Sequence, residues 1–429
     1  MAASEPMNSR LRAALDELLA DPARALSAAR DHIASGALRD DPPRPGADRR
    51  IGLELEFHLV DLARPARRPS WPQVARLLAR LPELPSRSRV SVEPGGQVEL
   101  STPPAIGVAA AVAALQADRK VVAAALADAG FGTAPLGTDP AREPRRINPA
   151  GRYAAMERHF TALRCARAGR AMMTATAALQ INLDAGAATG WAARLAQLRR
   201  LGPVLVALSA CSPLLAGHRS GWRSMRQETW YGIDARRGRA TSGSDPAAAW
   251  ASYALDAPVM LVRNGTRCRP VTERVPMTAW LDGSAPIDRR PVAGDLDYHL
   301  TTLFPPIRLR GYIELRCLDA VPDRWWPALA AIAVTVVEDE HAAEQAAQLC
   351  EPVRDRWLTA ARDGLADARV RAAALGCAEI AARYCPVELR ADVERYADLI
   401  AAGRTPGDDI RRRADQTSPL AVLEEQAHA

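Results

Sequence analysis

The chain has 429 residues, 48% of them hydrophobic, with 56 lysines and arginines against 50 aspartates and glutamates. This composition is typical of a globular protein, and the length suggests two or three domains of ~150 residues each. The basic residues form no long run interleaved with aromatics, which argues against nucleic acid as a partner. Because Lys120 is the only lysine, no glycine-rich loop carries a P-loop lysine, and Walker-type phosphate binding is excluded.

Cysteine usage and the N-terminal residues indicate a reducing compartment. The seven cysteines include no C-x-x-C pair, which argues against a disulfide framework or a zinc ribbon. The opening MAASEPMNSR lacks the basic and apolar regions of a secretory signal. The longest uncharged stretch, Leu201–Gly217, is shorter than the ~20 residues that a membrane span needs. We therefore expect a cytoplasmic protein with no membrane partner.

The N-terminal part of the chain changes from a helical to a strand pattern. Leucine and alanine recur with helical spacing over residues 11–35, and the Pro-rich, charged stretch Asp40–Arg50 predicts a linker. Ile51–Val60 (IGLELEFHLV) alternates apolar and polar residues, so it predicts a strand with one face of each kind. Val90–Leu100 predicts two strands around the turn Pro94-Gly95-Gly96.

Further strands and long helices follow. The same alternation predicts strands over Met173–Asp184 and Tyr312–Cys317, and Ala257–Arg263 is a further candidate strand. We expect the polar residues 404–429 to be loosely held. Ala/Leu-rich segments predict helices over residues 105–129, 189–209, 321–348 and 353–403.

The strand pattern decides the fold class. Strands with one apolar and one polar face predict an antiparallel sheet backed by helices on one side only. A parallel βαβ protein would instead show continuous apolar strands and a G-x-G-x-x-G turn, which this sequence lacks. The sequence therefore predicts an α+β fold.

The polar strand faces carry acidic residues, namely Glu54, Glu56, either Glu93 or Glu99, and Glu314. Glutamates two residues apart on a strand project to the same side, and burying them unpaired would be costly. A divalent cation resolves this by binding several carboxylate oxygens, and the oxygen-rich set favours Mg²⁺ or Mn²⁺ over zinc. The alternative is a solvated strand face with salt bridges to the many arginines.

Arginines form the second constellation. Arg223 and Arg226 lie three residues apart in GWRSMRQETWYGID, so on a helix they share a face. Arg308, Arg310 and Arg316 flank Glu314. Guanidinium groups bind carboxylates and phosphates bidentately, and beside a triphosphate they stabilise a transferring phosphoryl group. The alternative is that they are surface residues of an arginine-rich protein.

The motifs together resemble a known family. They are LELEF, VEPGGQVELS, MMTATAALQINLD, ACSPLLAGHRSGWRSMRQETW and HLTTLFPPIRLRGYIELR, in this order over roughly residues 50–320. This pattern resembles the glutamate–cysteine ligases of the plant and bacterial type, in the carboxylate–amine ligase group related to glutamine synthetase. Among bacteria, it is most similar to the ligases that supply γ-glutamylcysteine for ergothioneine synthesis.

The resemblance implies a fold and a division of the chain. The family has a curved antiparallel sheet of about six strands that forms a funnel and is backed by helices. We therefore expect a helix and linker over residues 1–48, a single catalytic domain over 49–405 and a polar tail over 406–429.

The resemblance also implies a reaction. ATP would phosphorylate the γ-carboxylate of L-glutamate, and the amine of L-cysteine would then displace phosphate to give γ-glutamylcysteine, ADP and phosphate. The expected cofactor is Mg²⁺, with Mn²⁺ as the alternative. The expected partners are these small molecules alone, and we expect a monomer or a weak homo-oligomer.

By the motif match, the carboxylates Glu54, Glu56, Glu93, Glu99 and Glu314 are the expected metal ligands, with Gln180 as a neutral ligand or a substrate contact. Arg226 is expected to hold the glutamate α-carboxylate and Arg316 to face the substrate or the phosphoryl group, and these two are the expected catalytic residues. Arg308 and Arg310 are the expected ATP-phosphate contacts. Arg223 and Trp230 are further expected pocket residues.

Three other hypotheses on function are compatible with the sequence. A ligase that joins glutamate to a different amine would carry the same metal and ATP machinery. A non-catalytic binding protein could share the fold, although the intact acidic set argues against it. A carboxylate-metal hydrolase or nuclease would need no arginine that binds glutamate.

Overall fold

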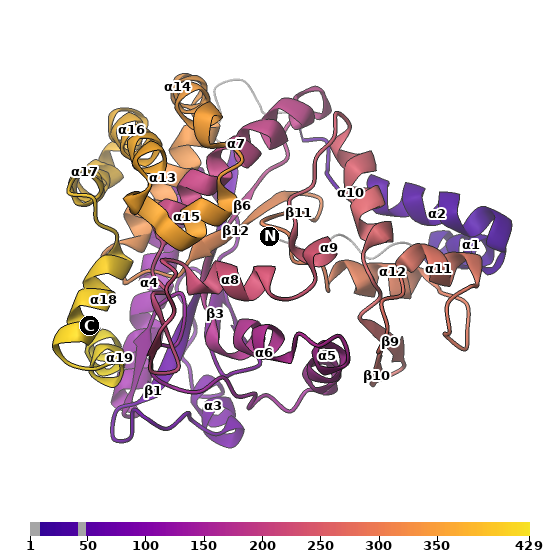
Figure 1. Cartoon of the computed structure of the whole chain (residues 1–429), viewed down its shortest axis with the longest axis horizontal. Helices are drawn as coiled ribbons and strands as arrows, with labels where there is room; N and C mark the ends of the chain where they lie inside the picture. The colour runs from indigo at the N-terminus through magenta and orange to yellow at the C-terminus, as the bar shows by residue number, and fades with distance from the viewer. Residues whose placement is uncertain (1–8, 42–48) are drawn as a thin grey trace.

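One antiparallel sheet lies at the centre of the computed structural model, which describes residues 9–41 and 49–429 (Figure 1). The strand order is β11-β12-β6-β1-β3-β2, and β4 and β5 also pair with β1. Every neighbouring pair is antiparallel. The strands are β1 Arg50–Asp61, β2 Arg89–Val92, β3 Val98–Ser101, β4 Ala105–Ile106, β5 Phe131–Ala134, β6 Ala178–Leu183, β11 Ile307–Leu309 and β12 Ile313–Asp319.

The alternation in β1 sorts its residues between two environments. Leu53, Leu55 and Phe57 are fully buried on the apolar face, while Glu54 and Glu56 project to the opposite side. Three helices lie behind the apolar face: one of them, α13, contacts both α4 and α7, and α4 and α7 contact strands of the sheet. They are α4 Gly107–Asp128, α7 Trp191–Ser209 and α13 Trp326–Glu338. The predicted α+β fold with an antiparallel sheet is confirmed.

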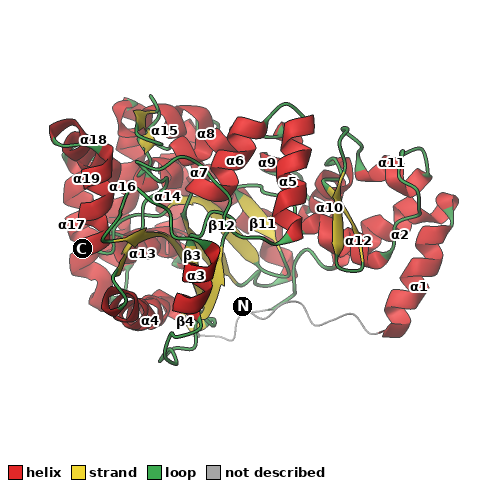
Figure 2. Ribbon diagram, turned by 90° about the horizontal axis from the view of Figure 1, so that it is seen from below, coloured by secondary structure: helices red, strands yellow, loops and turns green. Residues whose placement is uncertain are grey.

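Two helices lie toward the other side of the sheet, so the prediction of helices on one side only is wrong. Figure 2 shows α4 at the lower left and α6 and α8 above the strands. These are α6 Ala166–Ala175 and α8 Met225–Tyr231, which contact each other. They place side chains of α8 beside the polar face of β12.

The turn between β2 and β3 needs glycine. Gly96 has φ +90°, which side chains with a Cβ rarely adopt. A Cβ on Gly95 would lie 2.1 Å from the carbonyl oxygen of Thr174, at the end of α6. The predicted strand–turn–strand is therefore confirmed, and its glycines allow close packing against α6.

Some predicted element boundaries are wrong. The strand predicted over Met173–Asp184 begins only at Ala178, because α6 continues through Ala175. The side chains of Thr174 and Thr176 donate to carbonyls four residues earlier, which is a helical contact. All residues from Ala171 to Gln180 are buried, so the apolar pattern could not distinguish the two states.

The long helices after residue 320 are also broken. Asp339 ends α13, and its side chain caps the next helix by accepting from Ala342 N at 2.8 Å. The predicted helical segment over 353–403 forms three helices, α15 Trp357–Asp363, α16 Ala368–Tyr384 and α17 Val387–Ala401. The helix that Asp339 caps is α14 Glu340–Cys350.

The C-terminal residues are not a loosely held tail, so that expectation is wrong. They form α18 Pro406–Gln416 and α19 Pro419–His428, and α19 packs against β5. Val422 and Leu423 are buried. The charged residues of α18 make the segment look polar, because this helix is amphipathic and turns only one side to the core.

The N-terminal helices belong to a peripheral group that extends away from the sheet (Figures 1 and 2). The helix α2 contacts α10, α11 and α12 there. Residues 1–8 and 42–48, which include most of the expected linker, lie outside the described residues, and the domain boundaries stay predictions. The remaining elements are α1 Ser9–Ala20, α2 Pro22–Ser35, α3 Trp71–Leu78, α5 Gly151–Ala162, β7 Leu214–Leu215, β8 His218–Arg219, α9 Ala235–Gly238, α10 Pro246–Asp256, β9 Leu261–Asn264, β10 Arg267–Pro270, α11 Met277–Asp282 and α12 Ala293–Leu300.

We expect Leu423→Ala to destabilise the protein by about 2–4 kcal/mol, since it leaves a cavity between α19 and the core. Thermal unfolding followed by circular dichroism measures this. Leu11→Ala, at a position 64% exposed on α1, is the matched control and should change the melting temperature little. Equal effects of the two substitutions would contradict the packing of α19.

Candidate active site

Amide side chains of β6 hold the glutamates of β1. Asn182 Nδ2 donates to Glu54 Oε1 at 2.9 Å, and Gln180 Nε2 donates to Glu56 Oε1 at 3.0 Å. The second oxygen of Glu56 accepts from the backbone N–H of Ala178 at 2.9 Å. The pairing of β1 with β6 places these groups together, with Glu54 opposite Gln180. The carboxylates are therefore fixed in direction before any ligand binds.

Glu93 and Glu99 extend the acidic set onto the neighbouring strands. Glu99 lies opposite Glu56 in the pairing of β1 with β3. Its Oε1 accepts from the hydroxyls of Ser91 at 2.9 Å and Ser101 at 3.0 Å. Glu93 lies in the turn that joins β2 and β3. The structure thus brings four of the predicted metal carboxylates to one end of the polar face.

Burial of these four carboxylates raises their pKa values, and the nearby arginines do not offset it. Burial, together with the charges of Glu99 and Glu314, raises the pKa of Glu54 to about 7. Burial and neighbouring carboxylates also raise the pKa values of Glu56 and Glu99, and burial raises that of Glu93. Grouped carboxylates with raised pKa values are a common feature of functional sites.

The donor chemistry of this end suits a divalent cation. Asn182 Oδ1 is buried and has no hydrogen-bond partner, although Asn182 lies among the carboxylates. A carbonyl oxygen beside carboxylate oxygens is a ligand set that Mg²⁺ and Mn²⁺ accept. Within residues 9–41 and 49–429, no three acidic, histidine or cysteine side chains are already grouped closely enough to hold one ion. The predicted ligand set therefore stays a prediction, which the chemistry of these donors supports.

The other end of the polar face pairs acid with arginine. Arg308 makes two bonds to Glu314, one of them 2.9 Å long, and Arg316 lies 3.1 Å from Glu314 Oε1. Burial alone would raise the pKa of Glu314, but Arg308 and Arg316 outweigh it and lower the pKa to about 2. Arg310 is half exposed and lies 3.9 Å from the same carboxylate. Glu314 is thus already neutralised by arginines, unlike the other predicted metal carboxylates.

Gln180 connects the two ends. Its Oε1 accepts from Arg316 Nη1 at 2.6 Å while its Nε2 donates to Glu56. Because both the oxygen and the nitrogen of this amide are hydrogen-bonded, the side chain orients Arg316 relative to the acidic end. Arg316 thus uses one lone pair of the oxygen that is the predicted neutral metal ligand, and this role of Gln180 stays a prediction.

Arg226 is buried beside this face with donors to spare. It projects from the first turn of α8, and only 2% of it is exposed. Its Nη2 donates to the carbonyl of Arg316 at 2.9 Å, while Nε and Nη1 have no hydrogen-bond partner. Leaving such donors unpaired costs free energy, so the site is suited to an anionic group that would accept from them.

Arg223 lies apart from this constellation. It pairs with Asp408 of α18, and its backbone N–H donates to carbonyls at the end of α15. The expectation that Arg223 and Arg226 share a helix face is wrong, because α8 begins only after Ser224. The contacts of Arg223 attach the loop before α8 to the C-terminal helices.

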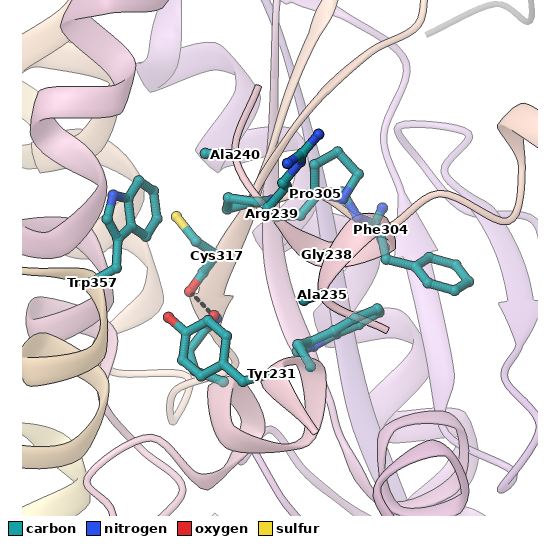
Figure 3. Close-up of a pocket in the computed structure, with 13 residues that line it drawn as sticks. Tyr231, Ala235, Gly238, Arg239, Ala240, Phe304, Pro305, Cys317 and Trp357 are labelled. Carbon is teal, nitrogen blue, oxygen red and sulfur yellow. Dashed lines mark hydrogen bonds between the residues drawn. The ribbon is translucent and has the colours of Figure 1, made fainter. Parts of the chain in front are cut away.

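A mainly apolar pocket of about 310 Å³ opens beside Arg316 (Figure 3). Trp230 and Phe304 pack against each other there, with ring centroids 5.2 Å apart. Tyr231, Cys317 and Trp357 are among the other wall residues that Figure 3 labels. The predicted pocket residue Trp230 therefore lines a cavity next to the polar face of the sheet.

The sequence matches the model of glutamate–cysteine ligase family 2 over residues 50–427. The chain belongs to glutamate–cysteine ligase family 2. This match includes the helices after residue 320, where the sequence offers no recognisable motif.

Known relatives of the chain are named glutamate–cysteine ligases. The chain is 48% identical over 400 residues to the glutamate–cysteine ligase EgtA of Mycolicibacterium smegmatis, covering 92% of this chain and 93% of that protein. It is 49% identical to EgtA of Mycobacterium tuberculosis over 393 residues, or 90% of each chain. The chloroplastic glutamate–cysteine ligase of Medicago truncatula is 30% identical over 72% of this chain and 64% of its own length.

The solved structures agree on the fold. A glutamate–cysteine ligase from Francisella tularensis, solved in complex with AMP, superposes with a TM-score of 0.55. The likeness covers 91% of this chain and 89% of that chain at 14% identity. The predicted ligase fold is therefore confirmed by structure as well as by family.

Two polar residues of the site were missed by sequence reasoning. Asn182 lies two residues after Gln180, so the alternation in β6 places both on the polar face, and that period was the available signal. Asp319, at the end of β12, binds groups more than 90 residues away in the chain. No local pattern could have identified it.

The acidic end should make the metal-free protein less stable as pH rises. A carboxyl whose pKa is raised on folding, such as Glu54, stabilises the fold below its unfolded value of 4.5. That contribution is lost as pH rises to about 7. We expect Glu54→Gln to flatten the fall in melting temperature between these two pH values, measured in EDTA. The control Glu83→Gln, at an exposed loop position, should leave the pH profile unchanged. A wild-type profile that rises across this range would contradict the assignment.

Proposed function

We propose that the chain ligates the γ-carboxylate of L-glutamate to the amine of L-cysteine at the expense of ATP. The observation that carries this is the buried Arg226, with unpaired donors, beside a sheet face that has an acidic end and an arginine end. Family membership implies ATP and a divalent metal in general. The names of the mycobacterial relatives support the specific substrates.

The reaction needs two steps because a carboxylate is a poor acyl donor. A γ-carboxylate oxygen of glutamate attacks the γ-phosphorus of ATP, and the bond to the bridging oxygen breaks to release ADP. The cysteine nitrogen then attacks the acyl carbon of γ-glutamyl phosphate, loses a proton and expels phosphate. Divalent metal would supply neutralisation of the phosphate charge.

The chain's own residues divide this work along the sheet. Arg226 binds the glutamate α-carboxylate through its free N–H groups. Arg316, held by Gln180 and Glu314, faces the reacting groups. Arg308 and Arg310 contact the ATP phosphates. Such fixed guanidinium groups need no reorganisation as negative charge moves, which favours the transition state.

Glu54, Glu56, Glu93, Glu99 and Glu314 are the proposed metal carboxylates, and Mg²⁺ is the proposed ion with Mn²⁺ as the alternative. The raised pKa values at the acidic end support this for the first four of them. Asn182 Oδ1 is a further proposed ligand, since it is buried without a partner. The mainly apolar pocket, with Trp230 in its wall, is the proposed place for the cysteine side chain.

The product would feed ergothioneine synthesis, as the likeness to the EgtA enzymes suggests. We propose a monomer or weak homo-oligomer in the cytoplasm that uses only small-molecule partners. In the described chain, none of the helices combines the length and hydropathy that crossing a bilayer requires.

The test is ADP release by the purified protein with Mg²⁺, ATP and L-glutamate, with and without L-cysteine. We expect release to rise strongly with cysteine and γ-glutamylcysteine to be detected by mass spectrometry. Release stimulated only by another amine would keep the mechanism and replace the acceptor. No release with any amino-acid pair would reject ligase activity.

Arg226→Lys should raise the KM for glutamate by about 10–100-fold, because a lysine cannot make bidentate bonds to a carboxylate. Steady-state kinetics with each substrate varied in turn measures this. Arg223→Lys is the control, since Arg223 pairs with Asp408, and its glutamate KM should stay within about twofold of wild type. An unchanged glutamate KM in Arg226→Lys would reject the proposed contact with the α-carboxylate.

A further inference from the structure

Asp319 forms a hydrogen-bonding centre where several distant segments meet. It is the last residue of β12 and is fully buried. Its Oδ2 accepts from the backbone N–H of Cys211 at 3.0 Å and from the hydroxyl of Ser212 at 2.6 Å. Its Oδ1 accepts from the hydroxyl of Ser224 at 2.8 Å and lies 4.0 Å from Arg226 Nη1. One carboxylate thus connects the sheet to the chain after α7 and to the start of α8.

The hydroxyls of Ser212 and Ser224 connect Asp319 to the first turn of α8. Ser212 Oγ donates to Asp319 and accepts from the backbone N–H of Arg226 at 3.0 Å. Ser224 Oγ donates to Asp319 and accepts from the backbone N–H of Gln227 at 3.3 Å. Because each hydroxyl has one proton, its donation to the carboxylate leaves its lone pairs for the helix. An acceptor at position 319 therefore fixes how the first turn of α8 is capped.

The same turn is attached to β12 by side chains. Arg226 Nη2 donates to the carbonyl of Arg316 at 2.9 Å, and Gln227 Nε2 donates to the carbonyl of Cys317 at 2.8 Å. The position of the Arg226 guanidinium therefore depends on both the cap and these two bonds.

We infer that Asp319 is a positioning residue, which through Ser212 and Ser224 sets the place and direction of the Arg226 guanidinium. The inference rests on the proposed function for its kinetic consequence, but its geometric part stands on the contacts alone. Asp319 is not proposed to touch a substrate, and it acts only through Arg226.

The opposite side of Asp319 is closely enclosed. A Cβ added to Gly137 would lie 2.7 Å from both Cγ and Oδ2 of Asp319. Those atoms are held by Cys211, Ser212 and Ser224, so they cannot move without breaking their bonds. Gly137→Ala should therefore disturb the carboxylate from a second direction without changing its chemistry.

The first experiment compares Asp319→Asn with wild type in full kinetics. An amide presents one acceptor where the carboxylate presents two, so at least one serine must turn its proton away from position 319. We expect the glutamate KM to rise at least about tenfold, which is the order of magnitude expected when one hydrogen bond is lost. The KM for ATP should stay within about twofold. Ser212→Ala, which keeps the carboxylate but breaks the connection, should raise the glutamate KM in the same way.

The matched control is Ser209→Ala. The Ser209 hydroxyl accepts from the backbone N–H of Asp319 at 3.2 Å and does not contact its carboxylate. The loss of this buried hydroxyl lowers stability but should leave the glutamate KM unchanged. A similar KM increase in Ser209→Ala and Asp319→Asn would reduce Asp319 to a general structural role and overturn the inference.

A crystal structure of Asp319→Asn gives a test that does not depend on substrate roles. We expect the Arg226 guanidinium to leave the carbonyl of Arg316. An unmoved guanidinium would overturn the inference even if activity fell. If Arg226→Lys leaves the glutamate KM unchanged, the proposed α-carboxylate contact fails, and this structure still decides whether Asp319 positions Arg226.

Discussion

The central constraint on this structure is the burial of several carboxylates on one face of a single sheet. Glutamates packed in this way repel each other and lose hydration. At one end of the face, neutral donors stabilise the carboxylates, since Asn182 donates to Glu54 and Gln180 donates to Glu56. At the other end, the positively charged Arg308 and Arg316 surround Glu314. Amides fix the direction of a carboxylate without adding positive charge, so the first end favours protonated carboxyls or a bound cation.

The two ends of the polar face therefore differ in charge: arginines neutralise Glu314 at one end, and no such neutralisation occurs at the other. Raised pKa values at the acidic end and the lowered pKa of Glu314 describe the same polarity from its two sides. A substrate that carries a cation-bound phosphate at one end and bare anionic groups at the other would align with it. Gln180 lies at the boundary, bonded to Glu56 on one side and Arg316 on the other. The boundary is therefore a fixed contact, so the two charge environments keep their separation.

Sequence alone could predict the parts of this arrangement that depend on local period. The alternation of β1 placed Glu54 and Glu56 on one face, and the glycines after Pro94 marked the turn to β3. Boundaries failed where both sides of a segment are buried, as before Ala178, because burial hides the period. The C-terminal helices were missed for a different reason: the many charged residues of α18 made the whole segment look polar and concealed the buried residues of α19, such as Leu423.

Residues that act through distant partners could not be predicted in this way. Asp319 has no distinctive neighbour in sequence, and its importance comes from hydroxyls that only the tertiary fold delivers. Its partner Arg226 shows why such support is needed. A guanidinium with unpaired buried donors is unfavourable by itself, and one hydrogen bond, to the carbonyl of Arg316, holds it directly. The backbone provides further support, because a cap anchored on the carboxylate of Asp319 fixes the turn where the arginine begins. The strain of an unsatisfied binding group is thus balanced by a neighbouring network that is fully satisfied.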